Sequence, residues 1–373
     1  MHCGRCAAVI ALLALNLTAC GGSGGLLTPK SPTAVTPVTI PGSSAAGPAP
    51  TSVQFATIAT PDTPAGGIAV VNGVVFLDAA SHFLSYNGSS FTSYGYVAQE
   101  GQAVSAIGGV NSLANAPGSD VSTIVQEGGA PPFRYSTALD TTNGHVIDSG
   151  VLTVFADDGL VSVARASNTI LWVMGYQLAS GTQFLNNGTV TFQNGLLANT
   201  GSFGTNDVFN AVTLGADGFI YAANDPFYNS QIPPAIYKID PTSGTILHTF
   251  ALSALSNVQQ LAPGADGAVW FTDSGTNNIG RIAQDGTLSS YLVPTANSGV
   301  SGITAGSDNA MWFTETTANK IGRIGANNAF TEYTIPTANT QPSGIAAGAP
   351  GACIPGTLFF VEANGLGKVT FAP

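Results

Sequence analysis

The sequence predicts an all-β fold, a seven-bladed β-propeller, and two observations support this prediction. Residues 264–282 (GADGAVWFTDSGTNNIGRI) and residues 306–324 (GSDNAMWFTETTANKIGRI) align without a gap at a spacing of 42 residues. Short apolar runs also follow turn pairs such as Asn-Gly and Asp-Gly along the chain. A repeat of this length, built from short strands and tight turns, is typical of propeller blades.

Turn pairs mark the predicted hairpin between the first two strands of each blade, because Asn-Gly and Asp-Gly readily adopt the positive φ angles that a two-residue loop requires. The apolar run after each turn is predicted to be a second strand that is buried on both faces, where one blade packs on the next. Trp270 and Trp312 fall in two of these runs and are predicted to pack between blades. The seven turn pairs are Asn72-Gly73, Pro117-Gly118, Asp158-Gly159, Asp217-Gly218, Asp266-Gly267, Asp308-Asn309 and Pro350-Gly351.

The propeller is predicted to span residues 52–373. Its N-terminal strand is predicted to close the ring. The last unit leaves no room for an outer strand before the chain ends. The segment that begins at Phe55 (FATIATPDTPAGGIAV) resembles the one that begins at Glu332 (EYTIPTANTQPSGIAA). Val53–Ile58 is therefore expected to complete the last blade, which removes the free edges of the ring.

Residues 1–19 are predicted to be a lipoprotein signal peptide. Ala7–Leu15 is too short an apolar stretch to span a bilayer, and Leu17-Thr18-Ala19-Cys20 resembles a bacterial lipobox in which Cys20 is lipidated. An ordinary signal peptide with a chance cysteine is the alternative. Residues 20–51, rich in Gly, Ser, Pro and Thr, predict a disordered tether. The expected location is the bacterial cell envelope, with the lipid as the only membrane attachment, on the periplasmic side or the cell surface.

The composition restricts the partners of the chain. Only 8% of the residues are charged and the net charge is −11, which argues against nucleic acid and anionic headgroups as partners. We expect a monomer whose propeller face binds a small-molecule, glycan or protein ligand.

Four acids are predicted to end second strands on one face of the ring, and we call them the acidic rim: Asp78, Asp273, Glu315 and Glu362. Gln259, Ser301 and Ser343 are their predicted hydrogen-bonding neighbours. The acidic rim is open to two interpretations. It could bind a polyol or a cation, since Ca²⁺ and Mg²⁺ prefer carboxylate oxygens. Alternatively, the acids could cap strand ends, or pair with the third-strand cations Arg281, Arg323 and Lys368.

The motif in Gly302–Glu315 and Asn319–Ile324, with partial copies at Leu261–Asp273 and Gly344–Gly348, resembles the virginiamycin B lyase (streptogramin lyase) family. The resemblance implies a seven-bladed propeller and a magnesium-dependent enzyme. The family opens the cyclic depsipeptide of type B streptogramins by elimination at the ester, using histidine and glutamate on one face. Its histidines stand just before the Gly-Ile of an inner strand, and the matching positions here are Gln259, Ser301 and Ser343.

Two functions from different classes follow from these residues. The first is a binding or interaction module without intact lyase chemistry, because a general base of suitable pKa is missing at the matching positions. The alternative is a magnesium-dependent carbon–oxygen lyase with displaced catalytic residues. Other propeller enzymes, such as a sugar or quinone-dependent oxidoreductase, form a third group. The histidines of the chain all lie outside the motif: His2, His82, His145 and His248.

Overall fold

The structure is a computed structural model, and the chain divides into two compact units, Met1–Thr39 and Ile40–Pro373. The first unit, with the predicted signal peptide and Cys20, lies outside the described residues, as does the predicted tether up to residue 45. The backbone is described for residues 46–95 (except 72, 80 and 81), for strands between residues 114 and 202, and for residues 209–224, 232–348 (except 242) and 356–371. Side chains are described in the same ranges apart from the strands between 114 and 202, and not for residues 65, 71, 78, 95, 210 and 326.

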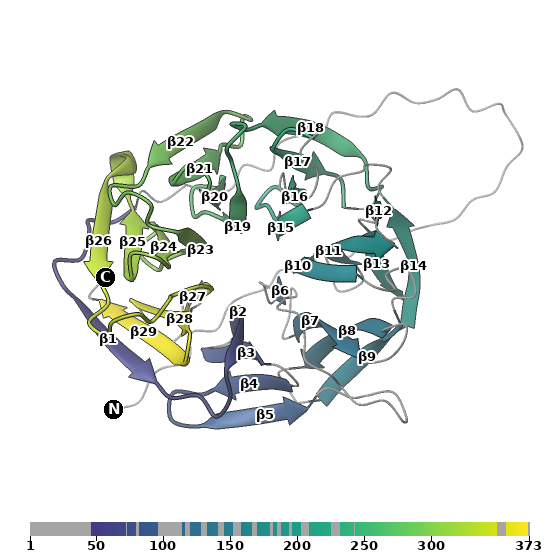
Figure 1. Ribbon diagram of the computed structural model, residues 1–373, viewed down its shortest axis with the longest axis horizontal. Coiled ribbons are helices and arrows are strands. Elements are labelled where there is room, and N and C mark those ends of the chain that lie inside the picture. Colours follow the sequence, from purple (N-terminus) through teal and green to yellow (C-terminus); the bar gives the residue numbers. More distant parts are fainter. Residues whose placement is uncertain are drawn as a thin grey trace, which may run out of the picture. The chain divides into compact units, whose positions relative to one another are not determined.

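The described strands form seven antiparallel sheets (Figure 1). The first three contain β2 (Pro64–Val71), β3 (Val74–Ala79), β4 (His82–Tyr86) and β5 (Phe91–Gly95); β6 (Ala114–Asn115), β7 (Asp120–Glu127), β8 (Phe133–Asp140) and β9 (His145–Val151); and β10 (Asp158–Arg165), β11 (Ile170–Ala179), β12 (Thr182–Phe184), β13 (Gly188–Gln193) and β14 (Leu196–Ser202).

The next three sheets contain β15 (Phe209–Leu214), β16 (Ile220–Asn224), β17 (Ala235–Ile239) and β18 (Ile246–Ala251); β19 (Val258–Pro263), β20 (Val269–Asp273), β21 (Asn278–Ile282) and β22 (Leu288–Leu292); and β23 (Val300–Ala305), β24 (Met311–Glu315), β25 (Lys320–Ile324) and β26 (Phe330–Thr334). A short 3-10 turn, Ala326–Asn328, precedes β26. The last sheet, here called the closing sheet, contains β27 (Ile345–Ala347), β28 (Thr357–Glu362), β29 (Gly365–Phe371) and β1 (Val53–Ile58).

Within residues 40–373 the sheets are arranged around a ring, with the first strand of each sheet toward its centre (Figure 1). This arrangement is a β-propeller, so the predicted fold class is confirmed. The connections between most strands of residues 96–208 lie outside the described residues, and the count of seven blades stays a prediction.

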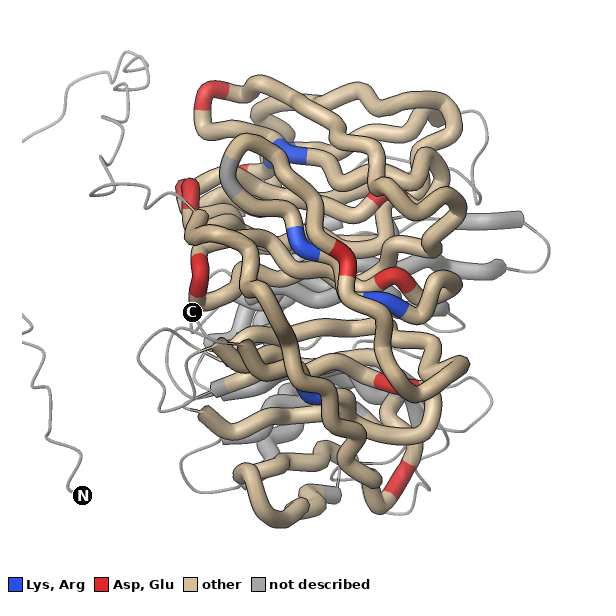
Figure 2. The backbone as a smooth tube through the Cα atoms, turned by 90° about the vertical axis from the view of Figure 1, so that its left-hand side faces the viewer, with Lys and Arg blue, Asp and Glu red and all other residues tan. Residues whose placement is uncertain are grey.

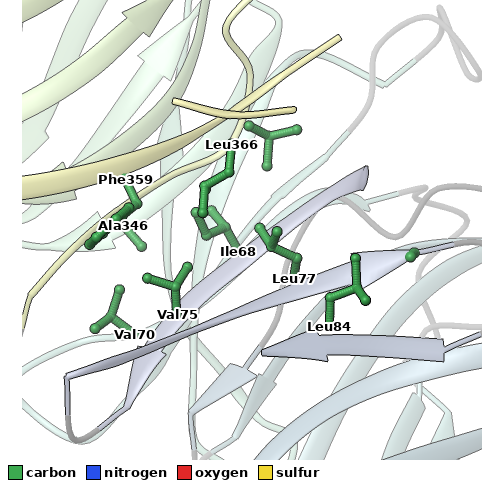
Figure 3. Close-up of a cluster of buried hydrophobic side chains, with 10 residues drawn as sticks. Ile68, Val70, Val75, Leu77, Leu84, Ala346, Phe359 and Leu366 are labelled. Atoms are coloured by element: carbon green, nitrogen blue, oxygen red, sulfur yellow. The ribbon is translucent and has the colours of Figure 1, made fainter. Parts of the chain in front are cut away.

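The closing sheet joins the two ends of the propeller. β1 pairs antiparallel with β29 in a continuous register from Val53 opposite Phe371 to Ile58 opposite Leu366. Side chains of this sheet also pack on the β2–β5 sheet in one apolar cluster, where Phe359 and Leu366 meet Ile68 and Leu77 (Figure 3). The predicted closure by the N-terminal strand is therefore confirmed.

The third sheet differs from the prediction. β10 is the innermost strand and contains Asp158-Gly159, whereas the sequence predicted a turn there and a second strand immediately after it. The pairing of β10 with β11 shifts register between Leu160 and Ser162. A glycine inside a strand often marks such a bulge, and here the Asp-Gly pair continues a strand instead of ending one.

The second strands β16, β20, β24 and β28 are buried along their whole length, as predicted. Trp312 is fully buried and stacks on Phe371 of the closing sheet, with ring centroids 4.7 Å apart. Trp270 belongs to the apolar cluster that joins its sheet to the β23–β26 sheet. The prediction that both tryptophans pack between blades is therefore confirmed.

The turns before β20 and β24 carry a repeated polar cluster, here called the turn triad. In the β23–β26 sheet, Asp308 accepts a hydrogen bond from the indole nitrogen of Trp312 (3.0 Å) and another from Arg323 Nε (2.8 Å). Asp266, Trp270 and Arg281 repeat this arrangement one sheet earlier. Arg281 and Arg323 thus pair with turn aspartates and not with the acidic rim.

The turns themselves explain the Asp-Gly pairs. The amide of Gly264 donates to the carbonyl of Ala268, which leaves a three-residue loop in which Gly267 has a φ of 75°. Such loops place a residue with positive φ at their last position, where glycine costs least. The predicted two-residue loop occurs at Gly73, between Val71 and Val74, but this repeat uses the three-residue form.

A segment before β1 lies along the β23–β26 sheet. The amide of Gly47 donates to the carbonyl of Asp308 (2.8 Å), and Arg323 Nη2 donates to the carbonyl of Gly47 (2.6 Å). Tyr333 donates its hydroxyl to the carbonyl of Pro50 (3.0 Å). The last residues of the predicted tether, Ala46–Pro50, are thus hydrogen-bonded to the propeller.

The described part of the chain contains no helix long and apolar enough to cross a bilayer. Charged residues are sparse along the tube in Figure 2, in line with a chain in which 8% of residues are charged.

Candidate functional site

The acidic rim residues Asp273, Glu315 and Glu362 occupy equivalent positions in three consecutive sheets. Each lies two residues after the phenylalanine that pairs with the inner strand: Phe271 opposite Leu261, Phe313 opposite Ile303, and Phe360 opposite Ile345. Antiparallel hairpins place the ends of these second strands next to the starts of the inner strands. The predicted common rim is therefore present for these three acids.

Asp78 does not share their position. Ile68 pairs with Leu77, so the residue two positions later is Ala79, and Asp78 corresponds to Thr314 in the β23–β26 sheet. Successive residues of a strand point to opposite faces, so a shift of one position changes the side of the sheet on which a side chain lies. The register places Ala79, and not Asp78, next to the other rim positions, and the side chain of Asp78 lies outside the described residues.

Asp273 is used by its own loop. Its Oδ1 accepts a hydrogen bond from the amide of Asn257 (2.7 Å), and its Oδ2 accepts one from the Thr276 hydroxyl (2.7 Å). Asn224, at the equivalent position of the β15–β18 sheet, likewise accepts from the amide of Ala235 (2.7 Å). At these two positions the strand-capping interpretation is the one that fits.

Glu315 is different, because it is 0% exposed and neither carboxylate oxygen has a hydrogen-bond partner among the described residues. Burial, followed by the charge of Glu332, raises the pKa of Glu315 to about 7, against the charge of Lys320 and the nearby Ser298 hydroxyl, which does not reach hydrogen-bonding geometry with Glu315. A buried carboxyl with such a pKa is half protonated near neutrality. Glu315 can therefore donate or accept a hydrogen bond in this pH range.

An internal ammonium group lies beside Glu315. Lys320, which pairs with Glu315 across the β24–β25 hairpin, donates from Nζ to Glu332 Oε2 (2.9 Å) and to the Thr295 hydroxyl (2.6 Å). The Glu332 carboxylate also accepts from the amide and the hydroxyl of Thr295. Although burial opposes this change, the bonds from Thr295 and Lys320 lower the pKa of Glu332.

Glu362 is 4% exposed, and its Oε1 has no hydrogen-bond partner among the described residues. Burial raises the pKa of Glu362, and the Thr57 hydroxyl partly opposes this rise. The residue borders a cavity of about 60 Å³, whose walls are Phe55, Ala56, Thr57, Ile335, Pro336, Thr337, Phe360 and Glu362.

The three predicted polar neighbours are half-buried at the starts of the inner strands or just before them. Ser301 and Ser343 contribute their backbone carbonyls, which accept hydrogen bonds from the hydroxyls of Thr272 (2.5 Å) and Thr314 (2.6 Å) of the preceding sheet. Gln259 donates weakly to the carbonyl of Asn257 (3.5 Å). In these contacts Ser301 and Ser343 hold blades together.

Of the described histidine side chains, His82 lies at the rim end of its sheet and His248 lies on an outer strand. His82 pairs with Ala79 across the β3–β4 hairpin, as Lys320 pairs with Glu315, and its Nε2 lies 3.1 Å from Asp62 Oδ2. His248 lies on the exposed outer strand β18 and contacts Phe250, with ring centroids 4.4 Å apart. The side chain of His145 lies outside the described residues.

Among the described residues, the rim acids do not form a cation site with several protein ligands. Within the described ranges, no three His, Cys, Asp or Glu side chains come together in a way that could hold a metal ion. Ca²⁺ takes six to eight oxygen ligands and Mg²⁺ prefers octahedral geometry. Asp273, one of the candidates, already has its oxygens bound within its own loop.

Sequence reasoning missed two groups of residues. The threonines of the WFT motif, Thr272 and Thr314, carry the hydrogen bonds between sheets, and their recurrence at the same place in both repeats was the available signal. The walls of the cavity at Glu362 come from β1, β28 and the segment before β27, so only the closed ring brings them together.

The repeats that form the rim also identify the relatives of the chain. Residues 236–372 match the virginiamycin B lyase family. The matched part runs from β17 to β29 and contains Asp273, Glu315 and Glu362, and it confirms the resemblance seen in the repeats. No curated protein matches the chain in sequence.

Solved structures agree with the virginiamycin B lyase-like fold. A streptogramin B lyase structure is 24% identical over 86% of this chain and 98% of its own, with a TM-score of 0.65. A catalytically inactive virginiamycin B lyase from Staphylococcus aureus with quinupristin is 24% identical over 86% of this chain and 100% of its own, with a TM-score of 0.66. YCF48 bound to D1 peptide, at 12% identity and a TM-score of 0.60, covers 90% of this chain and 100% of its own. At these identities the likeness concerns the fold.

Proposed function

We propose that the chain is an exported, lipid-anchored β-propeller that binds a ligand on its rim face and lacks intact lyase chemistry. The ligand would bind where the second strands end, around Glu315 and Glu362. The leader-like segment that ends at Cys20 supports the export and the anchor. The virginiamycin B lyase-like repeats support the choice of this face.

One observation carries the proposal. Where the lyase family has histidines before the inner strand, this chain has Gln259, Ser301 and Ser343, and the last two supply backbone carbonyls to bonds between blades. Neither a serine nor a glutamine side chain is a general base near neutral pH. The rim thus has buried carboxyl groups suited to binding, and the three positions that match the family's histidines carry no general base.

The alternative, a lyase with displaced catalytic residues, has one observation in its favour. The pKa of Glu315 is raised to about 7, which is the range of an effective general base. Glu315 is however 0% exposed, so a substrate would reach it only after a rearrangement of the rim loops.

A lyase assay separates these functions. Purified mature protein is incubated with Mg²⁺ and quinupristin, and ring opening is followed by mass spectrometry beside the lyase from Staphylococcus aureus. We expect the control to open the ring and this chain to leave it intact. Ring opening that is lost in Glu315→Gln would establish the alternative.

The anchor has its own test. In a bacterial host grown with labelled palmitate, the wild-type chain should incorporate label and fractionate with membranes. Cys20→Ala should do neither. Equal labelling of the two chains would contradict the predicted lipidation.

A further inference from the structure

The β23–β26 sheet and the closing sheet can be compared residue by residue at the rim. Glu315 pairs with Lys320, and Glu362 pairs with Gly365. The sequences before their inner strands align as well, since residues 293–295 and residues 335–337 have the patterns VPT and IPT. Each member of the cluster around Glu315 therefore has a counterpart around Glu362.

The counterpart cluster lacks the internal cation. Gly365 stands where the β23–β26 sheet has Lys320. Thr57 stands where that sheet has Glu332, because Thr57 pairs with Gly367 as Glu332 pairs with Gly322. The buried carboxyl remains at both sites, but the two counterpart positions of the closing sheet carry neither an ammonium group nor a second carboxylate.

The cavity lies where those missing side chains would be. Thr57, Pro336 and Thr337, the counterparts of Glu332, Pro294 and Thr295, all border it together with Glu362. A single water molecule needs about 10–15 Å³, so the cavity of about 60 Å³ has room for a larger group. Glu362 is 4% exposed, and its Oε1 has no hydrogen-bond partner among the described residues.

The walls suit an alkyl chain that ends in a charge. Phe55 and Phe360 meet edge to face, with centroids 6.5 Å apart, and both border the cavity. Aromatic rings attract ammonium groups and also cover the carbons attached to them. A divalent metal ion fits less well, since Glu362 is the only carboxylate among the described residues that line the cavity.

We propose that this pocket binds a primary ammonium group from outside the chain, in place of the lysine that the neighbouring sheet supplies internally. The Glu362 carboxylate would accept from the ammonium, the Thr337 hydroxyl would accept as that of Thr295 does from Lys320, and the phenylalanines would pack on the attached methylenes. The inference rests on the proposed function, for which it names a ligand class, because Glu362 belongs to the rim.

Calorimetric titration of the full mature chain with n-butylammonium chloride tests the pocket, with n-butanol and sodium chloride as matched controls. We expect saturable binding of the amine only. Glu362→Gln should weaken it at least tenfold, whereas Asp285→Asn, in the exposed turn between β21 and β22, should leave it unchanged. Equal binding by wild type and a folded Glu362→Gln, or no binding by wild type, would overturn the proposal.

A second variant keeps the test independent of changes to the buried acid. Thr57 is exposed on the outer strand, so Thr57→Lys can place an ammonium group beside Glu362 without disturbing the core. Thr57→Lys should melt at a higher temperature than wild type and lose amine binding. Thr57→Gln, which adds length without a charge, should not raise the melting temperature. Undiminished binding by Thr57→Lys would also overturn the proposal.

The same titration can distinguish two sources of the amine, a lysine of a partner protein and a free small molecule. Nα-acetyl-lysine-N-methylamide represents a lysine of a partner protein, and n-butylammonium represents a free amine. Tighter binding of either one supports the pocket and identifies its source. A negative lyase assay combined with no amine binding would leave the proposed function standing and remove this inference alone.

Discussion

The two ends of the second strands β20 and β24 differ in whether their acidic residues make the same hydrogen bonds in both sheets. At the turn end, Asp266 and Asp308 bind the same partners in the same geometry, a tryptophan and an arginine of their own sheet. At the rim end, Asp273 is held by four donors of the surrounding loops, whereas Glu315 has no hydrogen-bond partner among the described residues.

The residues at the turn end thus stabilise the fold, whereas those at the rim end include groups that a ligand could bind. The bonds from aspartate to tryptophan and arginine form within one hairpin and its third strand in both repeats, and Arg323 also donates to the carbonyls of Gly47 and Pro48. The rim end leaves buried carboxyl groups with unused hydrogen-bonding capacity, which costs stability. Unsatisfied groups of this kind are common at ligand sites, because a ligand can complete them.

The largest expected effect comes from breaking the buried turn triad. In Asp308→Ala, Arg323 (2% exposed) is left without its carboxylate. Removal of one partner of a buried ion pair typically costs about 3–5 kcal/mol. Urea unfolding should show this loss, and a midpoint equal to that of wild type would contradict the structural role of the triad.

Glu315→Gln tests the rim end through the pH dependence of stability. The pKa of Glu315 lies at about 7 in the folded chain and at 4.5 ordinarily, so the folded state holds the proton more tightly. Wild-type stability should therefore fall as the pH rises from about 4.5 to about 7. At 1.36 kcal/mol per pH unit, the variant should gain up to about 3 kcal/mol at pH 8 and nothing at pH 4.

The control for this measurement is Asp285→Asn, because hydrogen bonds from Thr287 lower the pKa of the Asp285 carboxyl, which stays charged above pH 5. The stability difference between this variant and wild type should not grow between pH 5 and pH 8. Parallel curves for wild type and Glu315→Gln would show that the Glu315 carboxyl is not destabilising when charged.

Thr314→Val tests the bonds between blades and should have an intermediate effect. The Thr314 hydroxyl accepts from the amide of Gly302 (2.8 Å) and donates to the carbonyl of Ser343 (2.6 Å). Valine keeps the shape and leaves both backbone groups unpaired, at a cost of about 1–3 kcal/mol. Thr272→Val should behave alike, and unchanged melting temperatures in both would contradict the assignment.

The smallest effect is expected from Asp266→Ala, the half-exposed copy of the turn triad. The side chains of Arg281 and Asp266 are 26% and 31% exposed. Solvated ion pairs contribute about 0–1 kcal/mol. Urea unfolding should give a loss well below that of Asp308→Ala, and equal losses would show that burial does not set the contribution of the triad.

Local patterns in the sequence predicted the blades and the strand that closes the ring. The repeat and its spacing determine which strands pair, and the similarity of the segments at Phe55 and Glu332 indicated that β1 plays the part of β26. Asp158-Gly159 misled the prediction, because an Asp-Gly pair allows a turn without requiring one.

The candidate site was only partly predictable. The position of Asp273, Glu315 and Glu362 follows from counting along a hairpin, but the register of Asp78 depends on where β2 and β3 pair. Asp273 is hydrogen-bonded and Glu315 is not because of the positions of loop amides and the lengths of the two side chains. The cavity at Glu362 is formed by strands from both ends of the propeller, which only the closed ring brings together.

The pairing of β1 with β29 also constrains how the protein is made. Val53 is among the first residues of the propeller to be synthesised and Phe371 among the last, yet they are partners in one sheet. Contacts so distant in sequence slow folding, because the intervening chain must be ordered first. Until β29 has been synthesised, the edge of β1 stays unpaired and prone to aggregation, so a chaperone that shields residues 53–58 should improve the yield of the closed ring.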